Sequence, residues 1–246
     1  MTAHIASAAT GIEYEYKWCI DDLAGAADPA RPDMLDDWFL AALDNGSDAV
    51  NAAHRDPFTF AQSALHFDTP RWELTEAGLS LTAAVNYGAR AGTGGLMVKE
   101  TVRWSGARRE ALEVSELVPT RELSRRIRDV SCVPIDRLRR RLPAFTLPVS
   151  PFAKVVQRRR KAVVELPSGA ELGISLDSSH LTTVDDTHTT NTRWWLEIEV
   201  NSGDRTTLGS LDAFMLEVRK VLARDPERRT KPQVFATVAG WRGTPR

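Results

Sequence analysis

The fold of this chain is decided by the stretch Ile12-Glu13-Tyr14-Glu15-Tyr16-Lys17-Trp18, near the N-terminus. Its letters alternate strictly, with apolar and aromatic residues on one side and Glu13, Glu15 and Lys17 on the other. This period of two predicts a half-buried β-strand. The charged side chains then lie about 6–7 Å apart on one strip, because a strand rises roughly 3.3 Å per residue. Such a strip is either exposed to water or arranged to hold a positively charged group.

Length and composition are those of a globular protein. The chain has 246 residues, of which 42% are hydrophobic and 26% charged, and no composition shift marks a linker, so a single domain over residues 1–246 is expected. No apolar run approaches the ~20 residues of a membrane span, and the first ten residues lack the features of a signal peptide. Cys19 and Cys132 fit neither a disulfide framework nor a zinc site. These features predict a cytoplasmic protein without a membrane segment.

The near-neutral total charge hides a strong segregation. Residues 1–78 carry 4 basic and 14 acidic side chains, residues 79–161 carry 18 and 7, and residues 162–246 carry 10 and 12. The acidic and basic thirds can cancel by packing together, or they can line one cavity that takes a metal on one wall and an anion on the other. Nucleic acid is disfavoured as a partner, because the total is only −1 and no reading motif accompanies the basic run at 137–141.

Hydrophobic periodicity predicts an α+β chain. Strands are expected at 12–18, 58–67, 79–85, 95–104, 109–114, 145–149, 152–164, 171–177, 193–200 and 234–238. Helices are expected at 33–43 (ended by Asn45-Gly46-Ser47), 71–77, 120–130, 135–142 and 208–223, with a loop or hairpin at 178–191. The C-terminal part, 206–240, therefore reads as a helix and a short strand appended to a core at about 11–220.

Several of these strands have one apolar and one charged face. An open sheet could expose the charged faces to water, whereas a closed barrel would turn them into a polar lumen and place its apolar faces outward. The predicted helices have apolar stripes that need a sheet surface to cover. This need favours the barrel.

The charged faces suggest a phosphate chemistry. The carboxylates at strand positions are Glu13, Glu15, Glu113, Asp177, Glu197 and Glu199. An oxygen-only set without histidine or cysteine suits Mg²⁺ or Mn²⁺. Cations that could grip phosphate oxygens are Lys17, Lys99, Arg103, Arg109, Lys154, Arg158 and Arg160. Carboxylates, a divalent ion and many cations around one cavity are what a polyphosphate requires.

The order of motifs resembles the CYTH-domain proteins, the triphosphate tunnel metalloenzymes. The opening Glu13-Tyr14-Glu15-Tyr16-Lys17 has their ExExK form. Six later segments agree in order over about residues 11–220: Phe67-Asp68-Thr69-Pro70 with Leu74 and Ala77-Gly78-Leu79-Ser80-Leu81; Val98-Lys99; Arg109-Glu110-Ala111-Leu112-Glu113; Lys154 to Arg160; Leu176-Asp177; and Leu196-Glu197-Ile198-Glu199 followed by Ser202-Gly203-Asp204.

The resemblance implies an eight-stranded antiparallel tunnel that binds a triphosphate end-on. Glu13, Glu15 and Lys17 would be its catalytic residues, the six carboxylates would hold one or two metal ions, and the seven cations would hold phosphates. The leading hypothesis is a metal-dependent hydrolase of an inorganic or organic triphosphate. A non-catalytic module that binds a phosphorylated ligand and a class IV-type adenylyl cyclase stay open as alternatives, and so does the oligomeric state, a homodimer included.

The chain also departs from the tunnel enzymes. Ser80, Thr82 and Ala84 stand where the lumen face normally has arginines, and Ala111 and Gly173 stand where acids are expected. Each lost arginine should cost on the order of 1.5–3 kcal/mol per charged hydrogen bond to phosphate. The departures indicate a different substrate choice, arginines supplied from elsewhere (Arg90 or Arg103), or a lapsed enzyme.

Overall fold

The structure, a computed structural model, describes residues 8–26, 34–87, 93–123, 125, 127, 132–143, 149–184 and 192–243. The strands are β1 (Ala8–Cys19), β2 (Ala53–His54), β3 (Phe58–Asp68), β4 (Leu79–Asn86), β5 (Thr93–Ser105), β6 (Arg108–Pro119), β7 (Ser150–Glu165), β8 (Glu171–Thr183) and β9 (Arg193–Val200). The helical elements are α1 (Asp21–Ala26), α2 (Met34–Ala49), α3 (Glu73–Glu76), η2 (Thr120–Glu122), α5 (Val133–Arg141), α6 (Arg205–Leu222) and α7 (Lys231–Val238).

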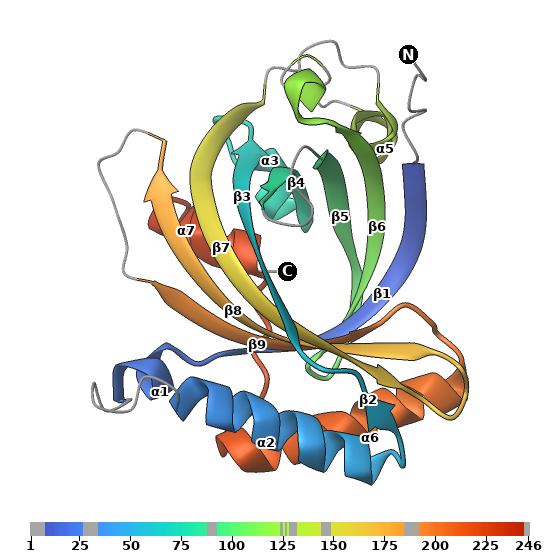
Figure 1. Cartoon of the computed structure of the whole chain (residues 1–246). Coiled ribbons are helices and arrows are strands. Elements are labelled where there is room, and N and C mark those ends of the chain that lie inside the picture. The colour runs from blue at the N-terminus through green and yellow to red at the C-terminus, as the bar shows by residue number, and fades with distance from the viewer. Residues whose placement is uncertain are drawn as a thin grey trace.

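Eight strands close into an antiparallel barrel. The ring runs β3-β4-β5-β6-β1-β9-β8-β7 and closes by the pairing of β7 with β3, and β2 adds a short outer pairing to β7 (Figure 1). Cross-strand partners share a face of the sheet, and Glu15 lies opposite both Arg109 and Glu199. The predicted α+β class and the eight-stranded antiparallel barrel are confirmed.

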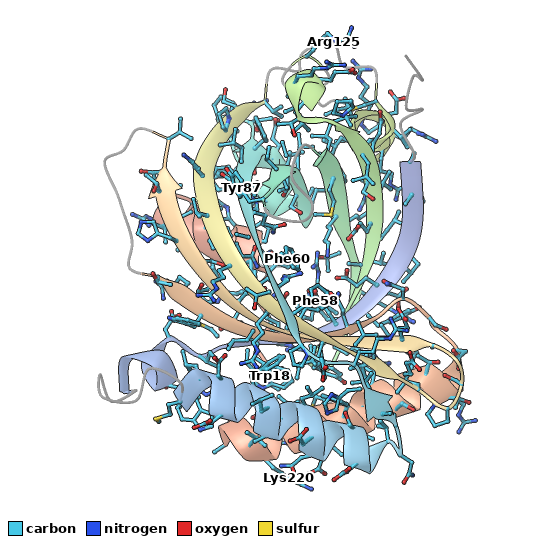
Figure 2. The ribbon with its side chains drawn as sticks, viewed as in Figure 1. Trp18, Phe58, Phe60, Tyr87, Arg125 and Lys220 are labelled. Carbon is cyan, nitrogen blue, oxygen red and sulfur yellow. The ribbon has the colours of Figure 1, made fainter. Side chains whose placement is uncertain are left out.

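The larger apolar core lies between the outer face of the barrel and two helices. α2 and α6 lie side by side beneath β8 and β9 in the view of Figure 1. Tyr16, Trp18 and Ile198 point outward from their strands into this core, and Figure 2 shows Trp18 between the barrel and α2. Trp18 is fully buried, and its indole N–H donates to the carbonyl of Arg224 at 3.2 Å. The apolar face of the opening stretch thus packs against helices, as its alternation predicts.

A second apolar core covers β4, β5 and β6 with α3 and α5. Asp68, in the Phe67-Asp68-Thr69-Pro70 segment, fixes the turn into α3. Its carboxylate accepts hydrogen bonds from the backbone N–H groups of Thr69, Leu74 and Thr75 at 2.7–2.9 Å, and from the Thr75 hydroxyl at 2.7 Å. This part of the motif is therefore structural.

Helix α2 continues past the expected stop at Asn45-Gly46-Ser47 and ends at Ala49. Gly46 is buried inside the helix, and a Cβ atom built on it would lie 2.5 Å from the Phe214 ring on α6. The glycine is therefore needed for close helix packing and not for a turn. Sequence alone could not separate these uses, because Phe214 is far from Gly46 in the sequence.

Replacing Gly46 with leucine is expected to destabilise the protein by about 2–3 kcal/mol, because overpacking outweighs the gain in helix propensity. Gly209→Ala on α6 is the matched control, since a Cβ there meets nothing within 4 Å and should stabilise by about 0.5–1 kcal/mol. Urea denaturation measures both changes. Equal stability of Gly46→Leu and the wild type would contradict the packing role.

The predicted strand at 234–238 is wrong, because this segment belongs to helix α7. Thr230 and Gln233 form a capping box: the Thr230 hydroxyl accepts from the Gln233 N–H, the Gln233 side chain accepts from the Thr230 N–H, and Pro232 stands in the first turn. These signals start a helix. Val234 and Phe235 then pack against β-strand residues at one end of the barrel.

Other expectations differ in their bounds. Strand β8 continues to Thr183, so residues 178–183 of the expected loop are extended. The expected helix at 120–130 begins with η2, and several of its later residues, like most of the expected strand at 145–149 and Arg90, lie outside the described residues. Among the described residues, no helix combines the length and apolarity needed to cross a membrane.

Candidate functional site

The inner face of the barrel encloses a cavity of about 500 Å³. Its lining residues are Ala9, Thr10, Gly11, Glu13, Glu15, Lys17, Gln62, Ala64, His66, Ser80, Thr82, Met97, Lys99, Arg109, Glu113, Ser115, Gln157, Arg159, Glu197, Glu199, Asn201, Lys231, Pro232 and Phe235. The opening strand thus turns its charged face inward, and β9 does the same with its own alternating carboxylates.

The two ends of the cavity differ. At one end α7 packs across the barrel: Phe235 contacts the inner-face residues Val155 and Trp195, and its ring meets His66 edge-on at 5.2 Å between centroids. The other end is bordered by Gly11 and Ser115 and is here called the open end.

The first charged cluster joins β1, β5 and β6. Lys99 donates to both carboxylate oxygens of Glu13 at 2.8 Å and lies 3.2 Å from Glu113. Arg109 donates to Glu15 at 2.9 Å and to the Thr101 hydroxyl at 3.0 Å. These contacts hold the two glutamates of the opening stretch on the inner face, each with its own cation.

The second cluster joins β7, β8, β9 and α7. Arg159 donates to both oxygens of Asp177 at 2.7 and 2.6 Å, and to Glu197 at 3.0 Å. Lys231 from α7 forms ion pairs with Asp177 and with Glu197, the latter at 3.1 Å. Asp177 is fully buried. The helix that closes one end of the barrel therefore also supplies a charge to the site.

Gly173 makes room for a third pair, in which Lys161 donates to Glu199 at 2.6 Å. A Cβ at position 173 would lie 3.1 Å from the Lys161 Cε atom and 3.2 Å from the Glu199 side chain. An acid at this position, as the tunnel enzymes lead one to expect, would displace this ion pair. Glycine at position 173 therefore leaves the space that the Lys161–Glu199 ion pair occupies.

Burial and neighbouring charges set different proton affinities along the strip. Burial raises the pKa of Glu13 to about 8 against the effect of Lys99, and the carboxylates of Glu199 and Glu15 raise it further. Burial also disfavours the charged form of Glu15, but Arg109 and Lys17 outweigh it and hold the pKa of Glu15 well below its ordinary value. Glu13 is thus the carboxyl that gains most from an additional cation nearby.

One wall of the cavity carries no charge. Strands β3 and β4 contribute Gln62, Ala64, His66, Ser80 and Thr82 to the lining. Burial lowers the pKa of His66 to about 4, with a further lowering from Lys231, so its ring is neutral at pH 7. The structure places Ser80 and Thr82 on the inner face, as the resemblance to the tunnel enzymes implies. Arg103 lies outside the cavity, so it does not take the place of the expected arginines.

Because the pKa of His66 is lower in the folded state than its ordinary value of 6.5, protonation favours unfolding. Stability should be full above pH 6.5 and fall by on the order of 3 kcal/mol as the pH drops toward 4. His66→Gln, which can still accept from Thr82, should remove this part of the pH dependence, whereas His180→Gln on the exposed side of β8 should leave it. Urea denaturation at pH 7 and 4.5 measures the difference, and parallel curves for all three proteins would contradict it.

Arg103 was predicted as a phosphate ligand, and this placement is wrong. The pairing of β5 with β6 shifts register between Thr101 and Arg103, so the side-chain alternation is interrupted there. Arg103 now lies opposite Glu110 and donates to it at 2.6 Å on the outer surface. Lys99 and Thr101, before the bulge, remain on the inner face.

Lys154, Arg158 and Arg160 were also predicted as phosphate ligands, and β7 places them on its outer face. Arg160 pairs with Asp36 of α2 at 2.6 Å and lies over the Phe39 ring, while Lys154 and Arg158 are exposed. The inner positions belong to their neighbours Arg159 and Lys161. The strand is mixed on both faces, so its alternation does not by itself identify the inner one.

The remaining predicted residues do reach the site. Eight of them, on β1, β5, β6 and β9, line the cavity: Glu13, Glu15, Lys17, Lys99, Arg109, Glu113, Glu197 and Glu199. Asp177, on β8, is fully buried against Arg159. Sequence reasoning missed Arg159, Lys161 and Lys231. Only Lys231 had a readable signal, the Thr-x-x-Gln capping box that starts its helix.

The donor chemistry fits a hard cation, but no ready-made site is present. Within the described ranges, no three Asp, Glu, His or Cys side chains converge closely enough to hold a metal ion, because each carboxylate carries a lysine or arginine partner. Glu13, Glu15 and Glu199 adjoin one another and offer oxygen ligands suited to Mg²⁺ or Mn²⁺. Asp177 does not fit, since it is fully buried between two cations.

Comparisons with known proteins support the fold. No protein-family profile and no curated protein sequence matches the chain. Among solved structures, a candidate adenylyl cyclase from Hippeastrum, described as having a dominant triphosphatase activity, is similar with a TM-score of 0.54 and 18% identity over 92% of this chain and 95% of that one. The PH1819 protein from Pyrococcus horikoshii OT3 is similar with a TM-score of 0.50 and 12% identity over 93% and 99%. The chain has the triphosphate-tunnel fold.

Proposed function

We propose that this protein is a metal-dependent hydrolase that releases phosphate from a triphosphate-containing substrate. One observation carries the proposal: a closed antiparallel barrel brings carboxylates of β1 and β9 against cations of β5, β6 and β7 around a cavity of about 500 Å³. The triphosphatase activity described for the Hippeastrum protein, which shares the fold, supports it.

Glu13, Glu15 and Glu199 would hold Mg²⁺ or Mn²⁺, with Glu113 and Glu197 beside them. The bound ion would supply positive charge for the phosphoryl oxygens and an activated water. Lys99 and Arg109 would then turn from their glutamate partners toward phosphate oxygens, and Arg159 would grip the phosphate chain from β7. Lys17, 3.9 Å from Glu15 and almost fully buried, would stabilise charge that develops on the phosphoryl group.

A non-catalytic module that binds a phosphorylated ligand is the second candidate. It is favoured by the charge balance of the inner face, where each carboxylate has a cation: the set of six acids (Glu13, Glu15, Glu113, Asp177, Glu197, Glu199) faces six bases (Lys17, Lys99, Arg109, Arg159, Lys161, Lys231). Such a balanced lumen needs no metal to be stable. It still offers anion-binding groups once a ligand competes for them.

The two candidates separate in one assay. Phosphate release from tripolyphosphate, ATP and UTP is measured with Mg²⁺ or Mn²⁺ and with chelator. We expect release that requires metal, and we expect Arg159→Gln to lower kcat/KM by on the order of tenfold or more, since a charged hydrogen bond contributes about 1.5–3 kcal/mol. Arg158→Gln, one residue away on the outer face, should match the wild type.

Thermal stabilisation by these ligands without any phosphate release, in folded protein, would instead establish the binding module. Equal losses in Arg158→Gln and Arg159→Gln would show that the inner face of β7 does not hold the substrate. Formation of cyclic AMP from ATP would identify a cyclase.

A further inference from the structure

Two phenylalanines stand at the open end of the barrel without a role in either apolar core. Phe58 and Phe60 are stacked on β3, with 6.1 Å between ring centroids and 22° between ring planes. Phe58 is 44% exposed. Figure 2 places both on β3, toward the end of the strand at which the chain enters it.

The register puts these rings on the inner face. Gln62 lines the cavity, and Phe58 and Phe60 precede it by four and two residues on an uninterrupted stretch of β3, so they share its face. Their cross-strand partners on β7 confirm this: Phe58 lies opposite Lys161 and Phe60 opposite Arg159, whose side chains join the inner ion pairs.

The rings lie at the end that α7 leaves free. Along β3 the chain runs from Phe58 at one end to His66, beside Phe235 of α7, at the other. Leu117 on the inner face of β6 is 53% exposed and lies beyond Ser115 at the same open end. An apolar rim with an aromatic pair thus borders the entrance to a charged cavity.

Polar groups suited to a neutral ligand follow the aromatic pair on the inner face, where Gln62 lies opposite Gln157. Gln62 donates to the Gln157 carbonyl oxygen at 2.9 Å across β3 and β7. Gln157 lines the cavity and is only 7% exposed. Its side-chain amide nitrogen is buried and has no hydrogen-bond partner within the described part of the chain. A buried donor without an acceptor is costly, and a ligand carbonyl or ring nitrogen would satisfy it.

We propose that Phe58 and Phe60 form a ring-binding subsite for the base of a nucleoside triphosphate. The amide of Gln157 would face its polar edge, and the phosphates would reach Arg159 beside the rings and Lys99 and Arg109 across the cavity. A planar heterocycle can stack on an exposed aromatic ring whichever polar atoms the heterocycle carries. Arg159 lies directly opposite Phe60, so a ring and a phosphate of one ligand can reach both. This inference rests on the proposed triphosphate site and specifies the organic group it takes.

The test compares nucleoside triphosphates with bare tripolyphosphate. We expect Phe58→Ala and Phe60→Ala to lower kcat/KM for ATP and UTP by about tenfold, the scale of base stacking, and to leave tripolyphosphate within twofold. Leu65→Ala is the matched control, because Leu65 is exposed on the outer face of the same strand. Phe60→Leu, which keeps apolar volume, serves should Phe60→Ala fail to fold, and it should show the same selective loss.

The outcomes separate this inference from the proposed function. The ring subsite is overturned if Phe58→Ala and Phe60→Ala lower phosphate release from tripolyphosphate and from ATP by the same factor. It is also overturned if the wild type hydrolyses tripolyphosphate alone. Either result leaves the proposed hydrolase standing. If no substrate is hydrolysed, calorimetry with the same three ligands decides: weaker binding of ATP and UTP by Phe58→Ala, with unchanged tripolyphosphate binding, supports the subsite in a non-catalytic module. Absence of ATP and UTP binding to the wild type overturns it.

Discussion

Glu15→Gln is expected to lower metal-dependent phosphate release by on the order of a hundredfold or more. Loss of an outer-shell partner of a metal ligand already costs about 10–100-fold, and Glu15 is proposed as a ligand itself. Its carboxylate is also kept ionised, because Arg109 and Lys17 hold its pKa well below the ordinary value against the effect of burial. The amide keeps an oxygen that can accept from Arg109, so the fold should survive.

Glu110→Gln is the control for this substitution. Glu110 lies opposite Tyr14 on the neighbouring strand, but its side chain points to the outer surface and pairs with Arg103. Glu110→Gln removes the same charge from the same part of the sheet without changing a residue that lines the cavity. Phosphate release and circular dichroism are measured together on both variants. Full activity of a folded Glu15→Gln variant would remove Glu15 from the metal site.

The inner face of β1 was predictable because its signal is local. Strict alternation over seven residues fixes which side of a strand is apolar, and apolar sides in a covered barrel face the helices. The same holds for Glu197 and Glu199 on β9, where Trp194, Leu196 and Ile198 alternate with the acids. The acidic part of the site could therefore be derived from sequence, and its resemblance to the tunnel enzymes added the ring closure.

The basic part could not be derived in the same way. On β7 both faces carry cations and valines, so the inward choice of Arg159 over Arg158 and Arg160 depends on which face α2 covers. On β5 the bulge after Thr101 reverses the face of Arg103. Both facts are tertiary. A one-residue change of parity exchanges every functional and structural assignment on a strand, and this explains why the errors cluster among the arginines.

Asp177→Asn is expected to destabilise the protein by about 3 kcal/mol, because removing one partner of a buried ion pair leaves charge uncompensated. Asp177 is fully buried and holds both Arg159 and Lys231. After the substitution these two cations share Glu197 alone. Lys231→Met by itself should cost less, since Asp177 keeps its two hydrogen bonds to Arg159. The double variant should recover part of the loss, and urea denaturation of the four proteins gives the coupling energy.

The same series decides between two roles for Asp177. If Asp177 is a structural anchor for Arg159 and for the helix that closes the barrel, Asp177→Asn should show its full loss of stability in chelator. Added Mg²⁺ or Mn²⁺ should then stabilise the wild type and Asp177→Asn equally. If Asp177 is a metal ligand, as the sequence predicted, Asp177→Asn should be less stable than the wild type only when metal is present. Its burial between two cations favours the first outcome. In that case the carboxylates proposed to hold the metal are Glu13, Glu15 and Glu199, and the fully buried Asp177 holds in place the arginine that we propose to bind phosphate.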